Sequence, residues 1–117
     1  MFHLKPIEAL NCYNKALAIN DKEPLTWYNK GKLLHEKLKD YNEALSCFNK
    51  TLDIKPLFTN ALIGKLNVLT TLGRYNEALE IVNREIEDSH NHNRGTLLLG
   101  KCRTLMVLLH NMLNQPN

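Results

Sequence analysis

The stretch Glu43–Lys50, which reads EALSCFNK, decides the fold because its pattern occurs three times in the chain. Glu8–Lys15 reads EALNCYNK and lies 35 residues earlier, whereas Glu77–Arg84 reads EALEIVNR and lies 34 residues later. Two successive matches at nearly the same step indicate a repeat architecture and not a coincidence of composition. The chain is therefore expected to consist of units of one kind.

Apolar residues within each unit follow the period of an amphipathic helix. They recur three and four positions apart in the segment Ala44–Leu52 and again in the segment Leu62–Leu69, which places them on one face of a helix. Residues that end helices lie between these segments, at Glu23-Pro24, Lys39-Asp40, Lys55-Pro56 and Gly73-Arg74. The sequence predicts no strand, and it predicts helices at residues 7–20, 24–38, 41–54, 58–72, 75–88 and 94–113.

A helix-turn-helix period of 34 residues with the pattern W-x2-L-G-x2-Y…A-x3-F…P is typical of the tetratricopeptide repeat, and the chain resembles that family over nearly its whole length. The second unit is the best copy, with pattern residues at Trp27, Gly31, Leu34, Ala44, Phe48 and Pro56. The third unit is degenerate and keeps Leu62, Leu66, Leu69, Ala78 and Val82, with His90 in place of the proline.

The resemblance implies an all-α fold, a right-handed α-solenoid of antiparallel helix pairs with about six helices. We expect a single domain over residues 1–117. It is divided into the second helix of a repeat at 7–20, one repeat at 24–56, one repeat at 58–90 and the first helix of a further repeat at 94–113.

The residue types in the repeat have a packing reason. Two helices approach closely only where a small residue admits a bulky side chain of the partner. The expected small residues are Gly31, Ala9, Ala44 and Ala78, and the expected fillers are Trp27 and Phe48. The residues predicted to be buried are Trp27, Leu34, Ala44, Phe48, Leu52, Leu62, Leu69, Ala78 and Val82. The step from Gly31 to Ala44 is one residue longer than the step from Leu66 to Ala78, which predicts a slightly longer loop after Leu38.

The composition is that of an ordinary folded domain, with 44% hydrophobic residues, which excludes a disordered chain. The net charge is +3, and basic residues alternate with acidic ones in Asp21-Lys22-Glu23, so charge alone does not indicate a nucleic-acid binder. The most apolar stretch, Leu97–Leu113, contains Lys101 and Arg103 and is too short to span a membrane. Three cysteines without a CxxC pair favour a reducing compartment. We expect a cytoplasmic protein.

Motifs that carry catalysis are missing from the sequence: it has no phosphate-binding loop, no nucleophile elbow and no HExxH. We therefore expect no enzymatic activity and no cofactor. His90 and His92 lack further ligands at a suitable spacing, so we expect a solvated loop and no metal site. Cys12 and Cys47 occupy the same place in successive repeats and are expected to be small buried hydrophobic residues.

The resemblance implies a concave working surface lined by the first helix of each pair. The residues one or two places along from the packed positions are expected to turn toward it, and they are Tyr28, Asn29, Lys32 and His35, then Ile63, Gly64, Asn67 and Thr70, then Arg94, Leu97, Leu98 and Lys101. Asparagine side chains suit the backbone of an extended peptide, and Lys32 and Lys101 suit acidic groups. The predicted function is protein–protein interaction, as a scaffold or adaptor for a peptide or helix of acidic character.

Some members of the family hold a C-terminal carboxylate with a basic and asparagine clamp, whose places fall here on Tyr28, Lys32, Gly64, Arg94 and Leu98. Only Arg94 keeps the required charge and Lys32 replaces an asparagine, so a chaperone-tail adaptor is disfavoured. Two alternatives stay open at this point, an RNA-binding helical array of similar period and the recruitment part of a larger enzyme. Trp27, Gly31 and Pro56 argue against the RNA-binding array.

The last predicted helix is apolar on more than one side. Leu97–Leu113 carries more leucine, methionine and valine side chains than one packing stripe can cover. We expect either a longer array whose next helix packs there or a homodimer that shares this face.

Overall fold

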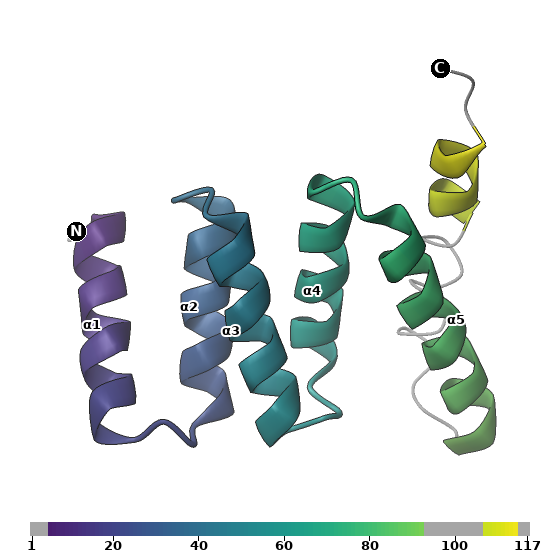
Figure 1. Ribbon diagram of the computed structural model, residues 1–117. Coiled ribbons are helices and arrows are strands. Elements are labelled where there is room, and N and C mark those ends of the chain that lie inside the picture. The colour runs from purple at the N-terminus through teal and green to yellow at the C-terminus, as the bar shows by residue number, and fades with distance from the viewer. Residues whose placement is uncertain (1–4, 93–106, 115–117) are drawn as a thin grey trace. The chain divides into compact units, whose positions relative to one another are not determined.

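The computed structural model describes residues 5–92 and 107–114, and these residues are helical with short connections and no strand. The labelled helices are α1 (Pro6–Ile19), α2 (Pro24–Glu36), α3 (Tyr41–Ile54), α4 (Thr59–Thr71) and α5 (Tyr75–His92) (Figure 1). Residues 107–113 are also helical. The predicted all-α fold is confirmed.

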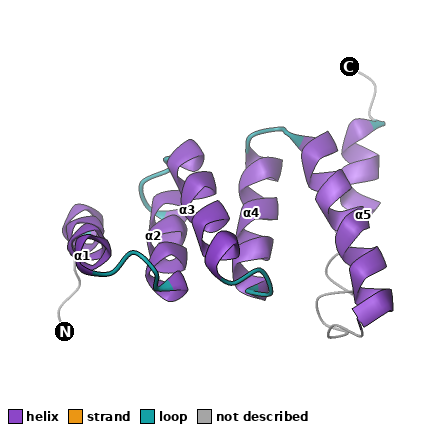
Figure 2. Ribbon diagram, turned by 60° about the horizontal axis from the view of Figure 1, so that its bottom comes forward, coloured by secondary structure: helices purple, strands orange, loops and turns teal. Residues whose placement is uncertain are grey.

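The chain divides into two compact units, Met1–Val68 and Leu69–Asn117. In the first unit α1, α2, α3 and the first part of α4 lie side by side in chain order, and their connections alternate between the two ends of the helices (Figures 1 and 2). The second unit holds the last residues of α4, helix α5 and the helical segment 107–113.

The predicted helix boundaries have local causes. Pro24 occupies the first turn of α2, and the Glu23 carboxylate accepts a hydrogen bond from the backbone N–H of Leu25 at 3.4 Å. Asp40 caps α3 by accepting a hydrogen bond from the backbone N–H of Glu43 at 3.3 Å. These caps satisfy N–H groups that have no partner within the helix.

The turn between α2 and α3 is one residue longer than the turn between α4 and α5, as predicted. In the first turn, the backbone N–H of Asp40 donates a hydrogen bond to the carbonyl of Leu34, six positions earlier, at 2.9 Å. In the later turn, the backbone N–H of Arg74 donates to the carbonyl of Leu69, five positions earlier, also at 2.9 Å. Both turns contain a residue with positive φ, Lys39 at 57° and Gly73 at 77°. Glycine adopts this conformation without the steric penalty that lysine carries.

Helix α5 extends to His92, beyond its predicted end at residue 88. The family pattern has a proline at the place of His90, and proline would end the helix because it lacks a backbone N–H. Histidine has no such effect, so the helix continues. Of the predicted helix 94–113, residues 94–106 lie outside the described residues.

The first unit packs around the ring of Phe48, which is 1% exposed. A Cβ atom on Gly31 of α2 would lie 2.9 Å from Phe48 Cε1, and a Cβ atom on Gly64 of α4 would lie 2.7 Å from Phe48 Cζ. Gly31 thus admits the Phe48 ring, in keeping with the expected roles of a small residue and a filler. The expectation that Gly64 turns toward a ligand surface was wrong, because the missing side chain makes room for the ring.

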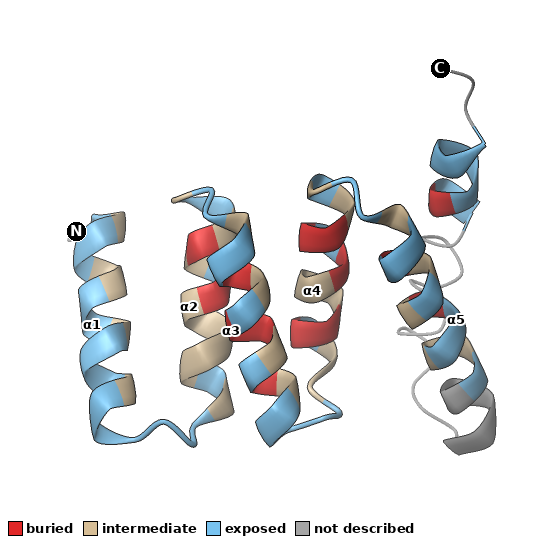
Figure 3. Cartoon of the chain, in the orientation of Figure 1, coloured by how far each residue is buried: buried red, intermediate tan, exposed pale blue. Residues whose placement is uncertain are grey.

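Seven of the nine predicted core residues are buried (Figure 3): Leu34, Ala44, Phe48, Leu62, Leu69, Ala78 and Val82. Trp27 and Leu52 are only half-buried, so those two predictions were wrong. Trp27 lies in the first turn of α2, where its indole N–H donates a hydrogen bond to the Asp21 carbonyl at 2.9 Å. This bond keeps the polar edge of the ring near the connecting segment, outside the core.

Cys12 and Cys47, which were both predicted to be buried, differ in their exposure to solvent. Cys47 is fully buried, whereas Cys12 is exposed, which contradicts the prediction for Cys12. Burial raises the pKa of the Cys47 thiol to about 11, and the positive charge of Lys30 lowers this pKa by a smaller amount. At neutral pH this thiol stays protonated and is a poor nucleophile. Its backbone carbonyl accepts a hydrogen bond from the buried Thr51 hydroxyl at 2.9 Å.

Candidate functional site

Each first helix of the first unit exposes one residue in its middle. In α2, Lys32 is the single exposed residue between Thr26 and His35, and in α4, Asn67 is the single exposed residue between Ala61 and Thr70, every position in both stretches being described. Lys32 and Asn67 are 35 positions apart. This is also the step from Gly31 to Leu66, the matching pattern residues of these two first helices, so Lys32 and Asn67 occupy equivalent places.

Burial on either side explains why these positions face outward. In α4, Leu62 and Leu66 are buried along one stripe, and Ala61 and Val68 are buried along another. With 100° between successive residues of a helix, Ile63 and Asn67 fall between the two stripes. Ile63 is half-buried there and Asn67 is exposed.

The aromatic residue Tyr28 belongs to a packed cluster. Its ring centroid lies 5.2 Å from that of Phe58 and 5.9 Å from that of Phe48, and both pairs are tilted. These are distances at which aromatic pairs stabilise each other. Phe58 lies directly before α4, at the first residue of the predicted helix 58–72, and was not among the residues predicted to be buried.

Two further residues of α2 are half-buried. His35 lies edge-on against Tyr41 of α3 with ring centroids 5.7 Å apart. Asn29 has the place in α2 that Gly64 has in α4, and it is half-buried. The predicted site residues Arg94, Leu98 and Lys101, and also Leu97, lie outside the described residues.

The face formed by Asn29, Lys32, His35, Ile63 and Asn67 is called the first-helix face below. It combines one full positive charge, amide groups that donate and accept hydrogen bonds, and one aliphatic side chain. Within residues 5–92 and 107–114, no group of three or more metal-ligating side chains comes together. Among the same residues, no helix is long and apolar enough to cross a membrane.

Comparisons with known proteins agree with the repeat pattern. The tetratricopeptide repeat family model matches residues 12–46. The TPR2B domain of yeast Sti1, solved in a complex with pHsp70, superposes with a TM-score of 0.76 over 92% of this chain and 84% of that one, at 20% identity. The chain belongs to the tetratricopeptide repeat family. Its fold class is accordingly the α-solenoid of that family.

Two further proteins are similar to this tetratricopeptide repeat chain, one in structure and one in sequence. The first TPR of Spaghetti (RPAP3), bound to the HSP90 peptide SRMEEVD, gives a TM-score of 0.68 over 91% of this chain and 83% of that one, at 20% identity. Protein CTR9 homolog of Arabidopsis thaliana is 38% identical over 81 residues, which make up 69% of this chain and 7% of that protein. The chain therefore corresponds to a small part of that curated relative.

Proposed function

We propose that the chain is a protein–protein interaction module that binds a peptide or helical segment of a partner protein along the first-helix face. Its family membership supports this function, and so do the two solved relatives, which are complexes with an Hsp70 ligand and an HSP90 peptide. We further propose that it works in the cytoplasm as a scaffold or adaptor without catalytic activity of its own.

The observation that carries the proposal is the pair Lys32 and Asn67, the single exposed residues in the middles of their helices. A side chain at this place in successive repeats would meet a ligand at regular steps. Asn67 can pair with a peptide backbone, and Lys32 can pair with a carboxylate. The next equivalent place in the sequence is Lys101, 34 positions after Asn67, which adds a second positive charge to the series.

The ligand we propose has acidic side chains but is not held by a clamp for a C-terminal carboxylate. Two places of that clamp fall on Tyr28, whose ring packs on Phe48 and Phe58, and on Gly64, which has no side chain to offer. The HSP90 peptide of the solved relative carries two glutamates and an aspartate, which fits acidic character in general. Specific recognition here would rest on Lys32 and Lys101.

Charge reversal of the first-helix face tests the proposal. A pull-down with mass spectrometry identifies a partner, and calorimetric titration of its binding segment then compares the chain with the variant K32E/K101E. We expect the dissociation constant to rise at least about tenfold, because two attractive pairs become repulsive. The matched control is K22E/K50E, which makes the same change of charge on exposed lysines of the connection before α2 and of α3. Equal affinity of K32E/K101E and the unaltered chain would assign binding to another surface.

We also propose that another helix covers the apolar residues near the C-terminal end, as part of a longer array or from a second copy. Val107, Leu108, Met112 and Leu113 are 57%, 50%, 41% and 37% exposed. Light scattering at tens of micromolar, with and without added downstream sequence, tests this. A clean monomer that gains no stability from the added sequence would contradict both versions.

A further inference from the structure

The first turn of α2 carries exposed apolar surface beside the first-helix face. Leu25 is 50% exposed and lies seven positions before Lys32, so both residues are on the same side of the helix. Tyr28 is between them, one turn after Leu25. Its ring packs on that of Phe58 with the centroids 5.2 Å apart, and Leu57, directly before Phe58, is 65% exposed. These apolar and aromatic residues are called the apolar end below, and they are Leu25, Tyr28, Leu57 and Phe58.

Charge distinguishes the apolar end from the middle of α2. The Glu23 carboxylate accepts a hydrogen bond from the backbone N–H of Leu25 at 3.4 Å, so it would repel an acidic side chain of a ligand at this end. Lys32 is exposed two helical turns further on, and no ion pair among the described residues involves it. The beginning of α2 therefore suits an apolar side chain of a ligand, and the middle of α2 suits an acidic one.

The equivalent positions of α4 carry neutral amides. Asn60 corresponds to Leu25 and Asn67 corresponds to Lys32, each 35 positions later, and both asparagines are exposed. Amide groups hydrogen-bond the backbone of an extended segment, whereas the backbone groups of a helical ligand bond to each other. Helix α4 thus favours an extended ligand without selecting its side chains. Helix α2 is the one that can select them, and it fixes a single register of the ligand.

We propose, building on the function proposed above, that the chain selects an extended segment with a large apolar side chain and an acidic side chain three positions apart. The apolar side chain contacts the apolar end, and the acidic side chain pairs with the Lys32 ammonium group. Leu25 and Lys32 are separated by about 10.5 Å along the axis of α2, at 1.5 Å per residue. In a polyproline II segment, residues three apart lie on the same side at a distance of about 9.3 Å, which matches this separation.

Other ligand conformations require other spacings. In a β-strand, residues three apart point to opposite sides, and residues on the same side are two or four apart. A helical ligand would need a spacing of seven, the same as that of Leu25 and Lys32 in α2. The preferred spacing between the two ligand side chains therefore reports the conformation that the first-helix face accepts.

NMR titration of the ¹⁵N-labelled full chain with synthetic peptides tests the spacing. Each peptide has one leucine and one glutamate in a background of alanine and serine, separated by two, three, four or seven positions, in both orders. Both ends are blocked, so that no terminal carboxylate competes with the glutamate. We expect the peptides with a spacing of three, in at least one order, to bind about fivefold more tightly than the others, because only they use both contacts at once. The shifted amide signals should include those of α2.

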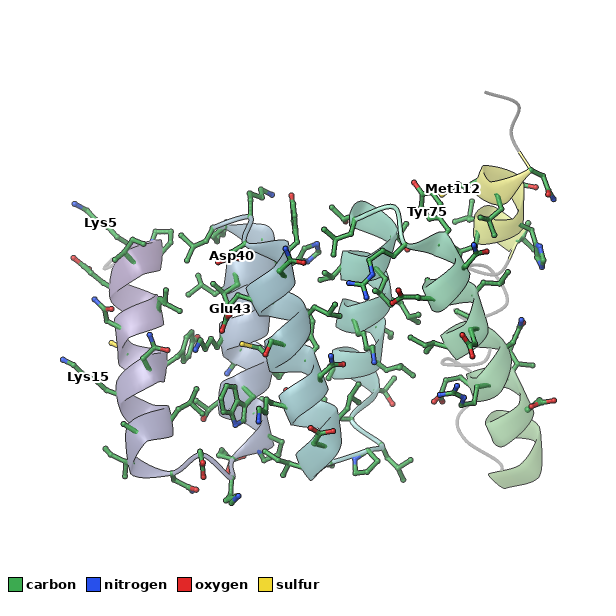
Figure 4. The ribbon with its side chains drawn as sticks, in the orientation of Figure 1. Lys5, Lys15, Asp40, Glu43, Tyr75 and Met112 are labelled. Carbon is green, nitrogen blue, oxygen red and sulfur yellow. The ribbon has the colours of Figure 1, made fainter. Side chains whose placement is uncertain are left out.

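Substitutions in α2 test the two contacts separately. L25A and K32A should each raise the dissociation constant of the best peptide about fivefold. Neither should affect the peptide that lacks the corresponding side chain. The matched controls are I7A, which removes a side chain of α1 that is 58% exposed, and K15A, whose lysine projects from the side of α1 that points away from α2 (Figure 4). Unchanged melting by circular dichroism shows that the fold of each variant is intact.

The outcomes separate this inference from the proposed function. Absence of binding by every peptide, equal affinity at all spacings, tightest binding at a spacing other than three, or equal losses in L25A and I7A would each overturn the inference. The proposed function would still stand if K32E/K101E weakens binding of the partner identified by pull-down. Both would fail if that double variant also binds the partner with unchanged affinity.

Discussion

Replacing Phe48 by alanine should lower the free energy of unfolding of the first unit by about 3–5 kcal/mol, the usual cost of removing a buried phenylalanine ring. The ring is 1% exposed, and it fills space that Gly31 and Gly64 both leave. Alanine would leave a cavity between α2, α3 and α4. The rings of Tyr28 and Phe58 would lose part of their support, because Tyr28 packs on both Phe48 and Phe58.

Urea denaturation followed by tryptophan fluorescence measures this effect in the first unit, because Trp27 is the one tryptophan of the chain and lies in α2. The control is Leu57→Ala, which removes a side chain that is 65% exposed and should change the free energy of unfolding by less than about 0.5 kcal/mol. A loss at Phe48 no larger than the loss at Leu57 would mean that the repeat register is misplaced.

Features set within one repeat were predictable from the sequence. The helix bounds Tyr41–Ile54 agree with the prediction residue for residue, and the longer turn before Asp40 followed from the Gly31 to Ala44 spacing. Both depend on residues close together in the chain, so the local pattern contains the information. The roles of Gly31 as a small residue and of Phe48 as a filler followed from the repeat pattern, but their contact with each other was not predicted.

Features set between repeats were not predictable in the same way. Cys12 and Cys47 occupy the same place in two matching stretches of the repeat, yet one is exposed and the other buried, because burial depends on which helix covers the face. Gly64 was expected on a ligand surface. Its position in α4 alone does not reveal that the Phe48 ring of the preceding repeat occupies the space beside it.

The candidate site also contains features set within one repeat, which were predicted, and features set between repeats, which were not. Lys32 and Asn67 were selected because they lie beside the packed positions of their own helices, and both are the exposed residues there. The packing of Tyr28 on Phe58 was not predicted, because it joins residues of successive repeats and the pattern within one helix does not show which side chains from another repeat lie against it. Whether the first-helix face binds a ligand depends on the partner, which residue patterns do not specify.

The double variant G31A/G64A should change sign in its effect on stability when Phe48 is replaced by leucine. In the unaltered chain both new methyl groups would stand 2.9 Å or less from the Phe48 ring, and overpacking of this kind costs about 1–3 kcal/mol per site. Alanine in place of glycine also favours a helix by about 1 kcal/mol at each position. The net expectation is a loss of about 2 kcal/mol. In the F48L background the ring atoms Cε1, Cε2 and Cζ are absent, and the tight contact that remains is the one between the new methyl group at position 31 and the Cys47 Cβ atom, at 3.1 Å. The helix preference at both positions then outweighs this one contact, so the double substitution should raise the free energy of unfolding. The test is urea denaturation followed by Trp27 fluorescence for four proteins: the unaltered chain, G31A/G64A, F48L and the triple variant. Stabilisation by G31A/G64A with Phe48 in place would show that the ring is not confined by the two glycines.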